Sequence, residues 1–296
     1  GSGPGWRRPG KYATVCGRCP EEGRNVTSDC IANISVARVD ADRFELRWGE
    51  DFSSGPVSVY AGPQPDAIDR GRALATNARG SAVVAVEGWR PYFELADDRG
   101  ERLLVAERGV PLEGGVNFRD LGGYRNDEGR RVRWGQLFRS GHMSKLTDAD
   151  QAAFTALGIR TVCDFRMGEE RANENIQLAA APHIETLGIP PGLKDRFFLH
   201  RLFEETDDPE VVAQAIHDIM RCLVSDCASH YGRLFEALLS ASPGSVLLNC
   251  SAGKERTGVG AALLLTALGV PRSTILYDFA LSRRYFPAAA EMPRAL

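Results

Sequence analysis

The stretch that decides the fold is Ser245-Val-Leu-Leu-Asn-Cys-Ser-Ala-Gly-Lys-Glu-Arg-Thr-Gly258. Its first part, Ser245 to Leu248, is an apolar run that is too short for a helix and suits a buried strand. An Ala- and Leu-rich run follows from Val259 to Leu268, with Gly269 and Pro271 as helix stop signals. The sequence therefore predicts a strand, a tight loop and a helix whose N-terminal end faces the loop.

This loop combines a cysteine with groups that hold an anion. A helix N-terminus near Lys or Arg lowers the pKa of a cysteine thiol, and the thiolate is the nucleophilic form. Arg256 is able to donate two parallel hydrogen bonds to phosphate oxygens, and Gly253 permits a turn that directs backbone N–H groups inward. We therefore predict that Cys250 attacks phosphorus and forms a phosphocysteine intermediate. The predicted phosphate-binding residues are Ser251, Ala252, Gly253, Lys254, Glu255, Arg256 and Thr257, and no metal or cofactor is predicted.

Two other loops that bind anions are excluded by spacing. A nucleotide-binding P-loop needs a glycine that is separated from Gly-Lys by four residues, and a Ser or Thr after the Lys. Here Leu248 stands upstream and Glu255 follows Lys254, so that match fails. Sulfur-transferring loops close with one residue fewer between cysteine and arginine than this sequence has. The spacing therefore favours phosphoryl transfer.

The loop Cys-Ser-Ala-Gly-Lys-Glu-Arg-Thr-Gly resembles the signature of cysteine-dependent protein tyrosine phosphatases. The bacterial branch that also acts on phosphoinositides, with His-Cys-x-x-Gly-Lys-Asp-Arg-Thr-Gly, is the most similar. Three other stretches resemble further hallmarks of this branch: Asn117–Tyr124, Leu137–Ser140 and Thr161–Arg166. The resemblance extends roughly from Leu112 to Phe286. It implies a phosphate monoester hydrolase that acts on phosphotyrosine and/or phosphoinositides.

The loop departs from the family pattern at two positions. Asn249 stands where the family has His, and Glu255 stands where it has Asp. The resemblance places the general acid at this Asp position, so Glu255 is the first candidate for that role. These departures also leave an alternative function, a catalytically weak or inactive module that binds phosphorylated ligands.

The catalytic residues predicted are Cys250, Arg256, Glu255 and Asp164. Asp164 is the second candidate for the acid because it ends a predicted strand, where ligand-binding residues collect in α/β sheets. An ion pair with Arg166 or Lys254 is an equally good interpretation of this carboxylate. Thr257 is implied by the resemblance to hydrogen-bond the thiolate, and helix capping is the alternative.

Composition limits the class of protein. The chain has 296 residues, a net charge of −3 and 43% hydrophobic residues, which gives no electrostatic argument for nucleic-acid binding. No apolar run approaches the length of a membrane span. A reactive cysteine favours the cytoplasm slightly, but Cys16, Cys19 and Cys30 leave an exported location open. For these three we expect a disulfide or free thiols rather than zinc. The oligomeric state is not predicted.

The pattern divides the chain into a poorly ordered leader (1–30), a β-sandwich accessory domain (31–108) and a phosphatase-like catalytic domain (112–296). Short alternating runs separated by Gly-, Asp- and Pro-rich turns favour the sandwich, which resembles a fibronectin type III module through its pattern with Trp48 and Tyr92. The strands expected there are Ile34–Arg38, Arg43–Trp48, Val57–Tyr60, Ala82–Val86, Tyr92–Leu95 and Leu103–Ala106.

The catalytic region is predicted to be α/β, with a parallel sheet flanked by helices. We expect strands at Arg133–Phe138 and Ile159–Phe165, and helices after the N-caps Thr147 and Asp208 and over Ser273–Tyr285. These elements alternate as a parallel sheet requires.

Two further features have two interpretations each. Arg119 and Asp120 form either a buried ion pair that supports the phosphate loop, which we favour, or a direct contact with substrate. The apolar stretch from Ile189 to Phe203 is either a lid over the site, as the resemblance implies, or part of the core.

Overall fold

The structure is a computed structural model that describes residues 34–176, 178–180, 182–188, 206, 208–240, 244–287 and 291. The predicted leader, the cysteines at 16, 19 and 30, and the predicted lid at 189–203 lie outside the described residues.

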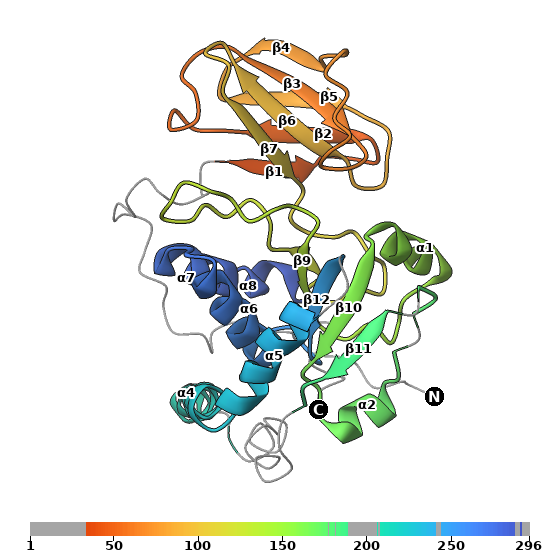
Figure 1. Ribbon diagram of the computed structural model, residues 1–296, viewed down its shortest axis with the longest axis vertical. Coiled ribbons are helices and arrows are strands. Elements are labelled where there is room, and N and C mark those ends of the chain that lie inside the picture. The colour runs from red at the N-terminus through yellow and green to blue at the C-terminus, as the bar shows by residue number, and fades with distance from the viewer. Residues whose placement is uncertain are drawn as a thin grey trace, which may run out of the picture.

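The N-terminal part consists of two antiparallel sheets, drawn in red to yellow at one end of the molecule (Figure 1). In one strand, Phe44 and Leu46 are fully buried between exposed Arg43 and Arg47, which is the alternation of a half-buried strand. The first sheet has the order β1-β2-β5, with bounds Ser35–Arg38, Arg43–Arg47 and Ser81–Ala85. The second has the order β4-β3-β6-β7, with bounds Ala75–Ala78, Val57–Gly62, Tyr92–Asp97 and Arg102–Ala106.

One core joins these two sheets, and it includes Phe44, Val59, Phe93 and Leu95. The strands expected from the sequence are confirmed, with ends that differ by one or two residues. Strand β4 was not predicted, because Ala-Thr-Asn-Ala has no aliphatic or aromatic alternation.

The second part is built on a five-stranded sheet of order β11-β10-β12-β9-β8. Its strands are β8 (Arg119–Asp120), β9 (Leu137–Ser140), β10 (Ile159–Asp164), β11 (His183–Thr186) and β12 (Ser245–Asn249). All neighbouring pairs are parallel except β8 and β9. The predicted parallel sheet is therefore confirmed, with one antiparallel strand at its edge.

The central strand β12 is buried on both faces. Leu247 belongs to the cluster with Phe138 and Phe154, whereas Leu248 belongs to the cluster on the opposite side with Leu265. This double burial explains why the strand reads as a continuous apolar run rather than an alternating one. In Figure 1, α1 lies on one side of the sheet and α5 to α8 lie on the other.

The helices begin largely where the sequence predicted. Thr147 and Asp150 form a capping box at the start of α1, and the Asp208 side chain caps α4 with Pro209 in the first turn. The bounds are α1 Asp148–Ala156, α2 Gly168–Asn173, α4 Pro209–Ser225, α5 Ala228–Ser240, α6 Glu255–Ala267, α7 Arg272–Ala280 and α8 Ser282–Tyr285.

Two predicted elements differ from the structure. The strand expected from Arg133 starts only at Leu137, because a turn around Gly135, with φ at +72°, precedes it. The single helix expected over Ser273–Tyr285 is broken at Leu281 into α7 and α8. Neither Gly nor Pro marks this break in the sequence. None of the helices in the described ranges is long and apolar enough to cross a membrane.

The two parts are in direct contact. Arg90 forms a buried ion pair with Asp120 at 2.9 Å, and the Trp134 indole N–H donates to the carbonyl of Leu104 at 3.0 Å. Tyr92, Ala106 and Trp134 form a small apolar cluster at the same junction.

Candidate active site

The predicted phosphate loop starts directly after β12, at the carboxyl edge of the parallel sheet. The register places Asn249 beside Asp164 of β10 and beside Ser140 of β9, so three strand ends meet here. Cys250 follows Asn249 and is 2% exposed. The predicted strand–loop–helix geometry is confirmed, since α6 begins at Glu255.

Gly253 shapes the loop around the thiol. Its φ is +67°, and a Cβ added there would lie 2.5 Å from the backbone of Ser140 and Gly141. Only glycine satisfies both conditions. The backbone N–H of Gly253 donates to Sγ of Cys250 at 3.2 Å, so the loop closes around the sulfur.

The carbonyl groups of the loop, from Ser251 to Lys254, are all bound from behind. The N–H of His142 donates to the first at 2.8 Å, and Nδ2 of Asn117 donates to the second and third at 3.2 and 2.8 Å. Arg139 donates to the third and fourth at 2.9 and 3.3 Å. Each peptide N–H points opposite to the preceding carbonyl. The N–H groups of residues 252–255 therefore face the side where an anion would lie.

A buried charged network holds Asn117 and Arg139 in place. Asp278 on α7 pairs with Arg139 at 2.6 Å and with Arg119 at 3.5 Å, and Tyr124 donates to it at 2.9 Å. Arg119 in turn donates to Oδ1 of Asn117. Burial raises the pKa of Asp278, but the charges of Arg139, Arg119 and Arg108 outweigh it and lower that pKa overall. Burial and the charge of Arg139 lower the pKa of Arg119 to about 10.

The supporting role predicted for Arg119 and Asp120 is therefore found for Arg119 only, and the two residues do not pair with each other. Arg119 binds Asp278, whereas Asp120 binds Arg90 across the junction with the N-terminal part. Adjacent residues of a strand point to opposite faces of the sheet, so the side chains of Arg119 and Asp120 point away from each other. The sequence placed both residues in the core correctly and paired them wrongly.

Arg256 is oriented by Glu170, a residue that the sequence reasoning missed. The guanidinium forms two parallel hydrogen bonds with the Glu170 carboxylate, at 2.6 and 2.8 Å. The hydroxyl of Ser251 donates to the same carboxylate at 2.5 Å. Burial opposes the charge of Glu170, but the hydrogen bonds and the charge of Arg256 lower its pKa to about 2. Glu170 is therefore ionised throughout the neutral range and holds Arg256 at the loop.

Asp164 forms the ion pair that the sequence left as one of two interpretations. Both of its carboxylate oxygens accept hydrogen bonds from Arg166, at 2.8 to 3.1 Å, and the residue is 1% exposed. Arg166 also donates to the carbonyl of Glu174 at 2.6 Å. The pair fixes the segment that carries Glu170, and through it Arg256.

Glu255 lies at the open rim of the loop, as the first residue of α6. Its side chain is 24% exposed, and its carboxylate lies 3.8 Å from the ammonium of Lys254. Lys254 itself lies 4.9 Å from the ring centre of Phe286. Unlike Asp164, Glu255 is thus accessible and only loosely paired.

The hydrogen bond expected from Thr257 is not formed. Its hydroxyl is buried and has no partner among the described residues, and Lys254 rather than Thr257 is the N-cap of α6. The amide of Asn249 is also buried without a partner in that part of the chain. Asn249 directly precedes Cys250 in the chain, and Thr257 lies in the first turn of α6.

Glu170 and Asp278 carried no clear sequence signal. Glu170 occupies the third position of the short helix α2, where its carboxylate accepts from the N–H of Met167 at 2.7 Å. An acid at this position looks like an ordinary cap. Among the described residues, no group of three or more His, Cys, Asp or Glu is placed to hold a metal ion.

Comparison with known proteins gives a consistent family assignment. A model described as "Tyrosine phosphatase family" matches residues 110–295. A Cupriavidus necator protein named as a candidate tyrosine-protein phosphatase is 32% identical over 165 residues, which is 55% of this chain and 59% of that protein. A tyrosine-protein phosphatase of Nostoc commune is 29% identical over 147 residues, covering 50% of this chain and 48% of that one.

A third relative is the triple specificity protein phosphatase PtpB of Mycobacterium tuberculosis, 28% identical over 198 residues, 60% of this chain and 70% of that protein. The matched region thus spans about half the length of the first two relatives. The crystal structure of P. aeruginosa TpbA aligns with 55% of this chain and 72% of that chain at 19% identity, with a TM-score of 0.28.

Proposed function

This chain belongs to the tyrosine phosphatase family, and we propose that it hydrolyses phosphate monoesters through a phosphocysteine on Cys250. The observation that carries the proposal is the orientation of the loop. Its carbonyls are bound from behind by His142, Asn117 and Arg139, so its N–H groups face the same side as the thiol. Preorganised donors of this kind stabilise charge that develops in a transition state.

The reaction proceeds in two displacements. The Cys250 thiolate attacks phosphorus, the bond from phosphorus to the leaving oxygen breaks, and that oxygen takes a proton from Glu255. Water then attacks the phosphocysteine, the P–S bond breaks, and Glu255 takes the proton from the water. In both steps the loop N–H groups and Arg256 bind the equatorial oxygens. Inorganic phosphate leaves, and the thiolate and the carboxylic acid are restored.

Glu255 is the better candidate for the acid because of where the two carboxylates lie. Glu255 is partly exposed, where a leaving group would pass. Among the described residues its ion pair is with Lys254 at 3.8 Å, and it also interacts with the charge of Arg256. Asp164 has both oxygens bound by Arg166 and is almost fully buried. In this proposal Asp164 positions the segment of Glu170 instead of transferring a proton.

We propose phosphotyrosine and/or phosphoinositides as substrates. The names of the relatives support the first, and the triple specificity named for PtpB supports a broader range. Lys254 adds positive charge at the rim, which helps any dianion and a multiply phosphorylated head group in particular. The division into an accessory domain at 31–108 and a catalytic domain at 112–296 is part of the same proposal.

A substrate panel tests this function. We expect release of phosphate from a phosphotyrosine peptide and from a phosphoinositide, with inhibition by vanadate, because vanadate adopts the geometry of the transition state. A phosphoserine peptide completes the panel. Binding of these ligands without any phosphate release would contradict the proposal and favour the non-catalytic module instead.

Glu255→Gln tests the acid. We expect kcat for a substrate with a poor leaving group, such as a phosphoinositide, to fall by about 10²-fold, the lower end of the range for general acid catalysis. For p-nitrophenyl phosphate the loss is smaller, because its leaving group needs less protonation. Glu236→Gln, at an exposed position on α5, is the matched control. Equal rates and an unchanged pH profile in Glu255→Gln would remove Glu255 from the mechanism.

A further inference from the structure

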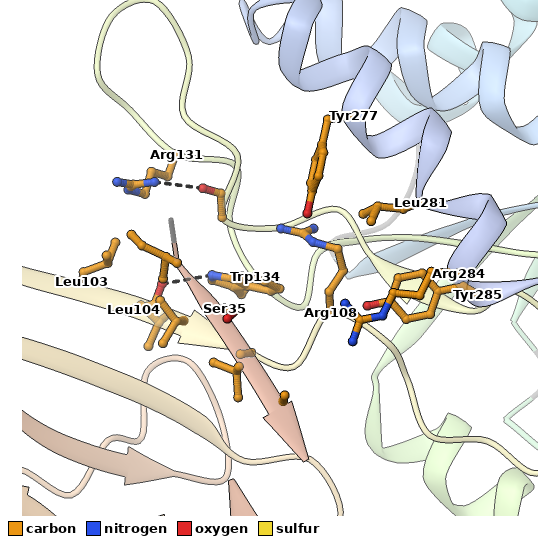
Figure 2. A pocket seen from close by; sticks show the side chains of 16 residues that line it. Ser35, Leu103, Leu104, Arg108, Arg131, Trp134, Tyr277, Leu281, Arg284 and Tyr285 are labelled. Atoms are coloured by element: carbon orange, nitrogen blue, oxygen red, sulfur yellow. Dashed lines mark hydrogen bonds between the residues drawn. The ribbon is translucent and has the colours of Figure 1, made fainter. Parts of the chain in front are cut away.

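A cavity of about 130 Å³ lies at the junction of the two parts of the molecule, away from the phosphate loop. Strands β1 and β7 form its wall on the N-terminal side, and α7 and α8 form the wall on the other. Three arginines line it: Arg108, Arg131 and Arg284. Figure 2 shows Arg108 among the lining side chains, with Trp134 to one side of it and Tyr285 to the other.

Among the described residues, these three arginines lack the carboxylate partners that other arginines at the junction have. Arg90 pairs with Asp120 at 2.9 Å, and Arg38 pairs with Glu107 at 3.2 Å. Within the described ranges, no carboxylate lies within ion-pair distance of any of the three cavity arginines, and no carboxylate lines the cavity. Among the described residues, the three cations of the cavity thus have no ion-pair partner, and the buried carboxylate of Asp278 acts on Arg108 only from outside the lining.

Arg108 is held ready at the centre of this group. Its guanidinium lies 4.1 Å from the ring centre of Tyr124 and 5.0 Å from that of Trp134. It donates to the carbonyls of Asp120 and Gly122 at 2.7 and 3.0 Å, which uses two of the five N–H donors of an arginine. Among the described residues, its other donors form no hydrogen bond, and the two rings beside the guanidinium restrict how the side chain moves.

Arg131 and Arg284 are exposed and complete the group at the rim. Arg131 donates to the carbonyl of Gly123 at 3.1 Å, and partial desolvation together with the charge of Arg125 lowers its pKa. The more distant carboxylates Asp51 and Glu101 oppose this lowering without reversing it. The guanidinium carbon of Arg284 lies 5.6 Å from the ring centre of Tyr285.

We propose that this cavity is a second, non-catalytic anion site that binds a phosphoryl group. Arginine forks match the oxygens of a tetrahedral oxyanion, and a cavity of this size is smaller than the pockets that hold drug-sized ligands. A small oxyanion such as inorganic phosphate is therefore the occupant that fits. The site is separate from the phosphate loop, because Tyr124 and Asp278 lie between Arg108 and Arg139, the arginine that binds the loop.

The test follows the indole N–H resonance of Trp134 while inorganic phosphate is added to the full chain. Trp134 lines the cavity, so its signal reports binding there rather than at Cys250. We expect a saturable shift in the wild type and at least a tenfold weaker dissociation constant in Arg131→Gln/Arg284→Gln. Both positions are exposed, so the variant is expected to fold. Arg221→Gln/Arg233→Gln, on α4 and α5, makes the same charge change elsewhere and is expected to leave binding unchanged.

A further arm uses Arg256→Lys, which weakens the phosphate loop alone. The Trp134 shift is expected to persist in this variant. The proposal would be overturned if the shift were lost in Arg256→Lys but retained in Arg131→Gln/Arg284→Gln. Absence of a saturable shift in the wild type would do the same. Inositol 1-phosphate identifies the source of the phosphoryl group. Weaker binding than inorganic phosphate supports a free anion, and tighter binding supports a phosphorylated head group in the same site.

Discussion

Cys250→Ser is expected to abolish phosphatase turnover, with a loss of at least about 10⁴-fold in kcat, as for the removal of other enzyme nucleophiles. The loop keeps its shape in this variant, because the carbonyl contacts from Asn117 and Arg139 do not involve the thiol. What is lost is the reactive sulfur, since a serine hydroxyl without an adjacent base is a weak nucleophile. The measurement is steady-state turnover of p-nitrophenyl phosphate together with rapid-quench detection of a phosphorylated enzyme.

The matched control is Cys227→Ala, which removes another buried thiol from the same apolar cluster. We expect its turnover to stay within a few-fold of wild type and its phosphoenzyme to remain detectable. Turnover that survived in Cys250→Ser would exclude the phosphocysteine mechanism. A phosphorylated enzyme in which the label resides on another residue would exclude it as well.

Asp278→Asn is expected to destabilise the protein by about 3–5 kcal/mol, the usual cost of removing one partner from a buried ion pair. Asp278 is 1% exposed and is the carboxylate that pairs with both Arg119 and Arg139. Without it, two buried guanidinium groups repel each other. Arg139 also loses the contact that directs it at Gly253, so turnover should fall in the folded fraction too.

Denaturant unfolding at several pH values checks this expectation. The pKa of Asp278 is lowered from its ordinary value of 3.8 in the folded protein. Its contribution to stability is therefore complete above that value and is lost as the pH falls through the lower folded-state pKa. Wild type and Asp278→Asn should differ most at neutral pH and converge in acid. Asp218→Asn, which removes a surface pair with Arg221, should leave the unfolding midpoint unchanged; a midpoint equally unchanged in Asp278→Asn would contradict the buried network.

Much of the candidate catalytic centre was determined by local sequence. A short apolar run, a glycine-containing loop and a long apolar run specify strand, loop and helix through contacts close in the chain, and β12 and α6 have these bounds within a few residues. The same holds for the caps of α1 and α4, where Thr147 and Asp208 bind N–H groups two or three residues away. The spacing of Cys250 and Arg256 is likewise a property of the chain itself.

The tertiary structure decided which residues support the loop. Glu170 reaches Arg256 across 86 positions, and Asp278 reaches Arg139 across 139. Such pairs depend on how helices pack against the sheet, and a single sequence offers no periodicity that reports it. For the same reason Arg119 and Asp120 looked like each other's partners until the sheet placed them on opposite faces.

The predictions for the candidate site divide between those that depend on local sequence and those that depend on the tertiary structure. The sequence alone predicted the nucleophile, the arginine and the phosphate loop, because their geometry is set within nine residues of backbone from Cys250 to Gly258. Only the folded chain separated Asp164 from Glu255, by burying one beneath Arg166 and leaving the other at the rim. Only the folded chain brought Arg108, Arg131 and Arg284 to one cavity. These arginines are far apart in the sequence, so they line one cavity only because the fold brings the elements that carry them together.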